Sequence, residues 1–176
     1  ARARWDNSNN TKRGLYIEPA DIRVKRFEQR KSSVMIFVVD ASGSSAYQRM
    51  AEAKGAIELI LADCYSHRTE VALIAFKGES ADLLLPPTRS LVRAKRTLAQ
   101  LPGGGGTPMG AALQAMHDLA LSVAASGATP SFILLTDGAA NVARDGTKSR
   151  IAGTEDAMNA AKAVSGADYR GILVDT

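Results

Sequence analysis

Three short apolar segments, each followed at once by polar residues, constrain the fold of this chain more than any other feature. They lie within residues 34–39, 70–76 and 131–136. An unbroken apolar run of this kind is typical of a strand buried on both faces, as in a parallel sheet covered by helices. We therefore expect an α/β fold, with a doubly wound, mostly parallel, Rossmann-like sheet and helices on both faces. Segments with helical spacing or helix caps lie at 49–65, 90–100, 108–126 and 154–164.

The short apolar segment 81–85 is expected to break the parallel pattern. It follows the strand at 70–76 after only four residues, which is too few for a crossover. The two strands should therefore pair antiparallel through a hairpin at Gly78. The prolines at 86–87 would then end this strand. A last strand is expected at 169–174, which completes a sheet with one antiparallel edge strand.

The positive charge of the chain is concentrated at its start. Residues 1–31 contain nine Lys or Arg and four Asp or Glu, whereas the rest contains thirteen and fourteen. We therefore divide the chain into a basic, largely flexible segment, 1–30, with a possible edge strand at 21–27, and one domain, 31–176. The basic segment fits a solvated linker. Contact with an acidic partner or with nucleic acid stays open, although no nucleic-acid-binding motif accompanies the charge.

The composition disfavours several classes of protein. No apolar run approaches the roughly 20 residues that a membrane-spanning helix requires. Cys64 is the only cysteine, so an internal disulfide is impossible, and this fits a reducing, cytoplasmic location. Cys64 also lies on the apolar side of the helix expected at 49–65, which indicates a core residue and not a reactive one.

Five oxygen-bearing side chains follow the expected strands or end the glycine-rich loop. The carboxyl ends of parallel strands meet at one edge of the sheet, where ligands of doubly wound folds bind. Residues that alternate by two after the first strand can point the same way, and the four glycines of 103–106 allow a flexible approach from the loop. We expect all five side chains to converge. They are Asp40, Ser42, Ser44, Thr107 and Asp137.

This set of oxygen ligands suits a hard divalent cation. Mg²⁺ is the expected ion, and Mn²⁺ or Ca²⁺ would fit the same chemistry. Mg²⁺ prefers six oxygens, and three neutral hydroxyls with two carboxylates would leave it short of negative charge. An open coordination position would then attract a carboxylate from another protein. The pattern therefore predicts recognition of a partner through a metal, with no catalytic residue in the domain itself.

The motif Asp40-x-Ser42-x-Ser44, with a remote Thr107 and with Asp137 in Thr-Asp-Gly, resembles a known metal site. It is similar to the metal-ion-dependent adhesion site of the von Willebrand factor A, or integrin I, domains. The resemblance covers the chain from about residue 33 onward. It implies that Ser42, Ser44 and Thr107 bind the metal directly. It also implies that the two aspartates act mainly through water.

A narrower resemblance is carried by residues 37–44, 49–55, 71–76, 83–90 and 101–108. These segments are similar to the C-terminal domain of the magnesium chelatase D subunit family. That family takes part in the ATP-dependent insertion of Mg²⁺ into protoporphyrin IX in chlorophyll and bacteriochlorophyll synthesis. The resemblance implies a domain that binds the AAA+ I subunit, with the porphyrin-binding H subunit as a further candidate, through a partner carboxylate on the metal. Ser45 departs from the Met that many members have there, at a position that does not ligate metal.

The same residues allow other interpretations, which their sequence context favours to different degrees. A phosphate-binding loop would need a Lys after the last glycine, where Thr107 stands. A serine hydrolase would need Ser44 within G-x-S-x-G and a partner histidine, and His67 and His117 are isolated from it in sequence. A metal-dependent scaffold of another complex and a metal-assisted phosphatase stay open. The cations at 89–96 form either a solvated face or a docking surface for an acidic partner.

Overall fold

The computed structural model describes residues 32–43, 46–101 and 103–175, which form a five-stranded sheet and four helices. The strands are β1 (Ser33–Asp40), β2 (Glu70–Lys77), β3 (Ser80–Thr88), β4 (Thr129–Thr136) and β5 (Arg170–Asp175). The helices are α1 (Ala46–Ser66), α2 (Leu91–Ala99), α3 (Met109–Ala125) and α4 (Arg150–Gly166).

The sheet confirms the expected doubly wound, mostly parallel fold. Its strands lie in the order β3-β2-β1-β4-β5, and only β2 and β3 run antiparallel. Those two strands form the expected hairpin, where Gly78 has a φ of 64° that favours glycine. The chain moves from β1 to β2 on one side of the sheet and later enters β4 on the other side. Strand order therefore reverses between β1 and β4.

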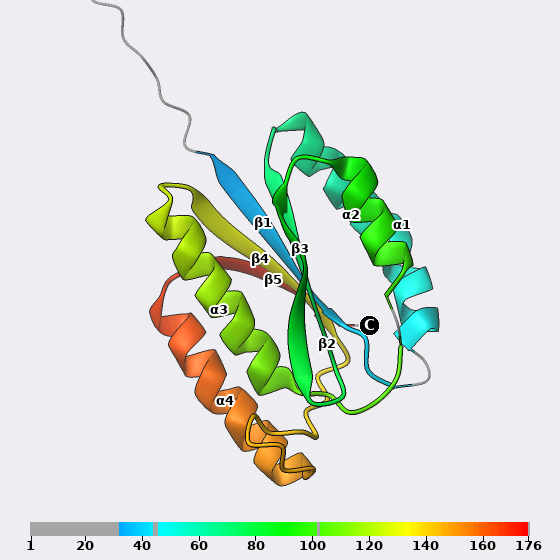
Figure 1. Cartoon of the computed structure of the whole chain (residues 1–176), viewed down its shortest axis with the longest axis vertical. Helices are drawn as coiled ribbons and strands as arrows, with labels where there is room; N and C mark the ends of the chain where they lie inside the picture. Colours follow the sequence, from blue (N-terminus) through cyan, green and yellow to red (C-terminus); the bar gives the residue numbers. More distant parts are fainter. Residues whose placement is uncertain (1–31, 44–45, 102, 176) are drawn as a thin grey trace, which may run out of the picture. The chain divides into compact units, whose positions relative to one another are not determined.

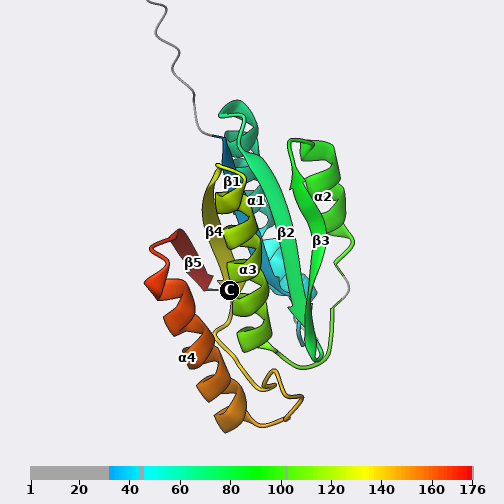
Figure 2. The same cartoon turned by 60° about the vertical axis from the view of Figure 1, so that its left-hand side comes forward.

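Helices cover both faces of the sheet. α1 and α2 lie against one face, and α3 and α4 lie against the other (Figure 1). Figure 2 shows α3 and α4 packed side by side. In β1, Ile36 and Val38 belong to the core beneath α3, whereas Phe37 and Val39 belong to the core beneath α1 and α2. All four side chains are completely buried, and each such burial contributes roughly 1.5–3 kcal/mol. This two-sided burial explains the continuous apolar run.

The expected end of β3 is wrong. The strand continues through Pro86 and Pro87 to Thr88, which pairs with Val71. The ladder between the two strands is irregular here, with register shifts on either side of Leu73. β3 is an edge strand of the sheet, so a proline there removes an N–H that the ladder does not need.

The expected start of α4, at about residue 154, is also wrong. The helix begins at Arg150, and the hydroxyl of Ser149 caps it by accepting the N–H of Ala152 at 3.5 Å. Gly153 weakens the helical pattern in this first part of the helix, because glycine is a poor helix former. A side chain is excluded there, since a Cβ on Gly153 would lie 2.9 Å from the carbonyl of Ala140.

Three further expectations concern the N-terminal segment, membrane-spanning helices and Cys64. The possible edge strand at 21–27 and the basic segment 1–30 lie outside the described residues. Within the described part of the chain, no helix is both long and apolar enough to cross a membrane. Cys64 is 4% exposed in the core beneath α1 and α2, as its sequence position predicts. Burial, together with the nearby charge of Asp63, raises the pKa of its thiol.

Candidate metal centre

The predicted site lies at the carboxyl ends of β1 and β4, the two strands between which strand order reverses. Val39 pairs with Leu135 in the parallel ladder, so Asp40 and Thr136 leave the sheet next to each other. Ligands of doubly wound folds bind in the crevice outside such a reversal point. The topology therefore places the end of the first strand and the Thr-Asp-Gly segment at the same edge.

Asp40 supplies a buried carboxylate, with 7% of its surface exposed. Its Oδ1 accepts the backbone N–H of Ser42 at 2.8 Å, and its Oδ2 accepts the hydroxyl of Thr136 at 3.2 Å. No ion pair among the described residues includes Asp40. A buried carboxylate is costly without a counter-charge, and each of its oxygens can accept more than one bond. The Asp40 carboxylate can therefore still interact with a cation.

Ser42 and Thr107 bring two hydroxyl groups together from segments far apart in sequence. Their oxygens, Oγ and Oγ1, lie 2.7 Å apart, and the residues are 4% and 3% exposed. In an octahedral Mg²⁺ site with metal–oxygen distances of 2.0–2.1 Å, neighbouring ligand oxygens lie about 2.9 Å apart. The observed separation is close to that value. The pair could therefore occupy two adjacent positions on such an ion with little movement.

The glycine-rich loop, which contains residues 103–106, places Thr107 at this edge of the sheet. Gly104 and Gly105 have φ values of 115° and 95°, which other residues rarely adopt. Two backbone hydrogen bonds join this loop to the segment after β1, Gly104 N–H to the carbonyl of Ala41 at 3.0 Å and Gly43 N–H to the carbonyl of Gly105 at 3.3 Å. The loop is therefore fastened to the residues that follow Asp40.

The remaining two predicted site residues are Asp137 and Ser44. Asp137 is exposed, and its Oδ1 accepts the N–H of Ala139 at 2.9 Å. Its neighbour Thr136 links it to the site, because the Thr136 hydroxyl donates to Asp40 and accepts the N–H of Gly138 at 3.1 Å. Ser44 lies outside the described residues. The described contacts thus join Asp40, Ser42 and Thr107 directly.

The set of residues predicted from the sequence omits two that contact the site. Thr136 is expected only to end a strand, although its hydroxyl donates to Asp40. Asn141 is absent from the predicted set, although its Oδ1 accepts the N–H of Thr107 at 2.7 Å and its own N–H donates to the carbonyl of Thr107 at 3.2 Å. The threonine adjoining Asp137 was a usable signal for the first. No local pattern pointed to the second.

A comparison with known families identifies the domain. The model of the von Willebrand factor type A domain matches residues 35–139, more than half of the chain. The matched span contains all five predicted site residues. The chain belongs to the von Willebrand factor type A domain family.

Curated relatives of this von Willebrand factor type A domain include much longer proteins. The magnesium-chelatase 60 kDa subunit of Cereibacter sphaeroides is 49% identical over 162 residues, which are 92% of this chain and 29% of that protein. The subunit of the same name from Rhodobacter capsulatus is 44% identical over 166 residues, 94% of this chain and 30% of that protein. The chain therefore spans less than a third of these relatives.

Solved structures support the same family fold. The pilus adhesin SpaC from Lactobacillus rhamnosus GG, in its open conformation, matches with a TM-score of 0.65 at 15% identity. The match covers 84% of this chain and 24% of that one. At this level of identity the likeness concerns the fold alone.

A cavity of about 450 Å³ adjoins the glycine-rich loop of this von Willebrand factor type A domain. Its lining includes Gly105, Gly106 and Asn141, together with Glu79 and Lys148. Lys148 Nζ lies 2.8 Å from Glu79 Oε1. This hydrogen bond and the opposite charge lower the pKa of Glu79 and raise the pKa of Lys148. The pair spans the space between the β2–β3 hairpin and the residues before α4.

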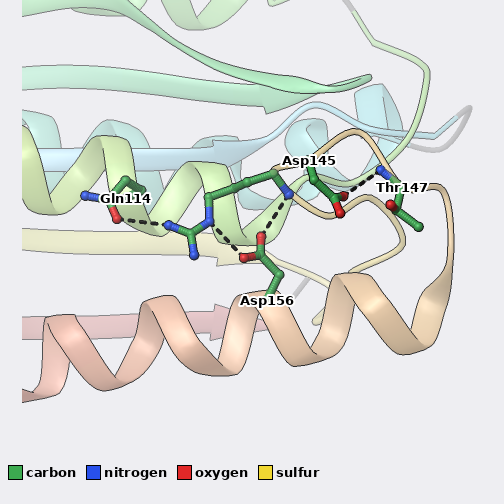
Figure 3. A network of polar contacts seen from close by, with 5 residues as sticks. Gln114, Asp145, Thr147 and Asp156 are labelled. Atoms are coloured by element: carbon green, nitrogen blue, oxygen red, sulfur yellow. Dashed lines mark hydrogen bonds and ion pairs between the residues drawn. The ribbon is translucent and has the colours of Figure 1, made fainter.

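A polar network fixes the segment between β4 and α4 (Figure 3). The Nε of Arg144 donates to Oδ1 of Asp156 at 2.8 Å, and the Arg144 backbone N–H donates to Oδ2 at 3.0 Å. Nη1 of Arg144 also donates to Gln114 on α3 at 3.1 Å. Asp145 accepts the N–H of Thr147 at 2.8 Å, which lowers the pKa of the Asp145 carboxyl. The segment that holds Asn141 is therefore joined to both α3 and α4.

The chemistry of the donor set fits a hard divalent ion. No three His, Cys, Asp or Glu side chains gather as a metal-binding group within residues 32–43, 46–101 and 103–175. An ion at this edge would therefore depend on hydroxyl oxygens as well as carboxylates. Ser42 and Thr107 would hold it, and Asp40, which accepts the N–H of Ser42, would supply negative charge. Oxygen donors of this kind suit Mg²⁺ or Mn²⁺ and not the softer metals.

Proposed function

We propose that this domain binds Mg²⁺, or Mn²⁺ in its place, at Asp40, Ser42, Ser44, Thr107 and Asp137. We further propose that it uses the bound ion to dock onto another protein. The observation that supports this most is the pair of buried hydroxyls, Ser42 Oγ and Thr107 Oγ1, 2.7 Å apart beside the buried carboxylate of Asp40. The bound ion would supply an electrophilic position that takes one further oxygen ligand.

The side chains of this domain have distinct tasks in that docking. Ser42 and Thr107 are neutral, so they leave much of the positive charge of a divalent ion uncompensated. Asp40 is held in one orientation by Ser42 N–H and the Thr136 hydroxyl, and it supplies charge without needing to move. A carboxylate from a partner would complete the shell and balance the remaining charge. None of these steps requires a nucleophile or a base.

The partner proposed here is the AAA+ I subunit of magnesium chelatase, and the porphyrin-binding H subunit is a second candidate. The relatives named magnesium-chelatase 60 kDa subunit support this assignment, since they match 92% and 94% of the chain. In this role the domain would serve the ATP-dependent insertion of Mg²⁺ into protoporphyrin IX without carrying out chemistry itself. The inserted Mg²⁺ is the substrate of that reaction and is distinct from the resident ion.

The test is capture of purified I subunit by this chain in Mg²⁺, in EDTA, and in EDTA followed by excess Mg²⁺. The informative variant is Thr107→Val, which removes one hydroxyl and keeps the side-chain volume. Thr97→Val is the matched control, because the Thr97 hydroxyl binds only the carbonyl of Arg93 on α2 at 2.9 Å among the described residues. We expect the wild type and Thr97→Val to capture the I subunit when Mg²⁺ is available and not in EDTA alone.

The proposal fails if EDTA leaves capture unchanged, or if Thr107→Val captures as much I subunit as the control. Circular dichroism of both variants checks that the fold is retained. Hydrolysis of p-nitrophenyl phosphate by the isolated chain, abolished by Thr107→Val, would instead favour a metal-assisted phosphatase. Binding of Mg²⁺ by the chain without capture of the I or the H subunit would favour a scaffold of another complex.

A further inference from the structure

Thr107 directly follows a loop segment that is costly to order. Four glycines precede it, and a glycine loses more conformational freedom on ordering than any other residue. The two backbone bonds that fasten the loop to the segment after β1 end at Gly104 and Gly105. Neither of them reaches Thr107. A contact at Thr107 itself is therefore needed to fix its amide on the glycine side, whereas Pro108 and α3 follow on the other side.

The geometry points to Asn141 as the positioning residue of the metal site, acting by holding both peptide groups that flank Thr107. Its Oδ1 accepts the Thr107 N–H at 2.7 Å, and its backbone N–H donates to the Thr107 carbonyl at 3.2 Å. We call these two hydrogen bonds the Asn141 clamp. Two bonds from one residue restrain Thr107 on both sides of its Cα atom. The inference rests on the proposed function, because it assigns a role within that site.

The segment that bears Asn141 is itself well fixed. The flanking residues Ala140 and Val142 are 7% and 2% exposed, so they anchor the backbone on either side. Arg144, three positions further on, is tied to Asp156 on α4 and Gln114 on α3 (Figure 3). The clamp therefore connects a glycine-rich loop to a part of the chain that is held by two helices.

Close packing between the two segments makes the clamp possible. A Cβ on Gly106 would lie 2.5 Å from Cγ2 of Val142 and 3.1 Å from Oδ1 of Asn141. Only a glycine lets the loop approach this near without displacement. Asn141 itself is exposed, so its truncation would remove the acceptor without opening a cavity in the core. Its loss should therefore affect the loop more than the fold.

The clamp should raise metal affinity by limiting the loop to the conformation in which Thr107 faces Ser42. When only part of the population is competent to bind, the observed affinity falls by that fraction. Loss of a residue that orients a metal ligand typically lowers metal affinity about 10- to 100-fold. We expect a loss of this size from Asn141→Ala.

The experiment measures two quantities on the whole chain. The first is the affinity for Mn²⁺ alone, from electron paramagnetic resonance of the free ion. The second is the rate of hydrogen exchange at the Thr107 amide, measured by NMR without metal. Asn141→Ala should weaken Mn²⁺ binding about 10- to 100-fold and speed Thr107 exchange by a similar factor. Asn141→Asp keeps an acceptor oxygen and should keep Thr107 exchange slow.

Asn159→Ala is the matched control, because Asn159 is an exposed asparagine within α4. It should change neither quantity. Slow Thr107 exchange in Asn141→Ala would refute the clamp, and fast exchange with unchanged Mn²⁺ affinity would refute its positioning role. Thr107→Val separates this inference from the proposed function. If that variant loses Mn²⁺ binding and Asn141→Ala does not, only the inference about Asn141 fails. If Thr107→Val binds Mn²⁺ normally, the proposed site fails, and with it the role of Asn141 there.

Discussion

Gly106 offers the sharpest test of how closely the glycine-rich loop packs, and the change to make is Gly106→Ala. The added Cβ would lie 2.5 Å from Cγ2 of Val142 and 3.0 Å from the carbonyl oxygen of Gly78. Carbon atoms in contact prefer about 3.5–4.0 Å, so the loop or Val142 must move by about 1 Å. Val142 is 2% exposed and has little room to turn. The overlap is thus expected to displace the residue before Thr107.

Overpacking of this kind destabilises a protein by about 1–3 kcal/mol. We expect Gly106→Ala to lower the free energy of unfolding within that range, as measured by urea denaturation in EDTA. Gly55→Ala is the matched control, because nothing lies within 4 Å of a Cβ there and Gly55 lies within α1. That change should stabilise the protein by roughly 0.5–1 kcal/mol through helix propensity.

A double-mutant cycle with Val142→Ala isolates the clash. Val142→Ala removes the Cγ2 atom, so the double variant should be more stable than the sum of the two single effects by about 0.5–3 kcal/mol. Gly106→Ala with the stability of the wild type would refute the packing argument. So would a cycle in which the two effects simply add.

Three other perturbations test separate parts of the fold. Gly110→Ala would place its Cβ 2.8 Å from Cγ of Asp156. We therefore expect it to lower the free energy of unfolding, measured by urea denaturation, by about 1–3 kcal/mol. This loss should largely disappear in an Asp156→Ala background. Because Lys148 lowers the pKa of Glu79, the Glu79–Lys148 pair should stabilise the fold above the ordinary Glu pKa of about 4.3 and cease to do so as the pH falls through the lowered pKa. The stability difference between wild type and Lys148→Gln should therefore shrink on acidification, and a constant difference would count against the pair. Cys64 is buried and its thiol pKa is raised, so iodoacetamide should alkylate it slowly in the native state and rapidly in urea, whereas equal rates would mean that the thiol is accessible.

The sheet was predictable because burial leaves a direct trace in sequence. Successive residues of β1, such as Phe37 and Val38, point into two different cores. Both faces of the strand are therefore apolar, which appears in the sequence as an unbroken apolar run. The hairpin between β2 and β3 followed from a linker too short for a crossover. The end of β3 could not be inferred in the same way. A proline is excluded from a central strand and tolerated at an edge, and edge position is a property of the whole sheet.

The candidate site was predictable as far as topology determines it. Asp40 and Ser42 follow one strand, and parallel neighbours end at the same edge, so their proximity to the Thr-Asp-Gly segment followed from strand order. The pairing of Val39 with Leu135 and the bond from Thr136 to Asp40 agree with that expectation, whereas the position of Thr107 depends on the path of the glycine-rich loop. Ser44 lies outside the described residues, and its part in the site stays a prediction.

Asn141 could not be found from local patterns. Its bonds to Thr107 join residues 34 positions apart, and they depend on the path of two loops and not on spacing within a helix or strand. The contact between the hydroxyls of Ser42 and Thr107, which lie 65 positions apart, likewise depends on the path of a loop. Contacts that depend on loop paths are set by packing, such as the close approach of Gly106 to Val142.

Calorimetric titration of Mg²⁺ into the wild type and into Ser42→Ala/Thr107→Ala tests the central claim most directly. We expect saturable binding of a single ion by the wild type and loss of that binding in the double variant, with circular dichroism showing that the fold is retained. Equal binding by both proteins, or no binding by the wild type, would contradict a metal site at this edge of the sheet.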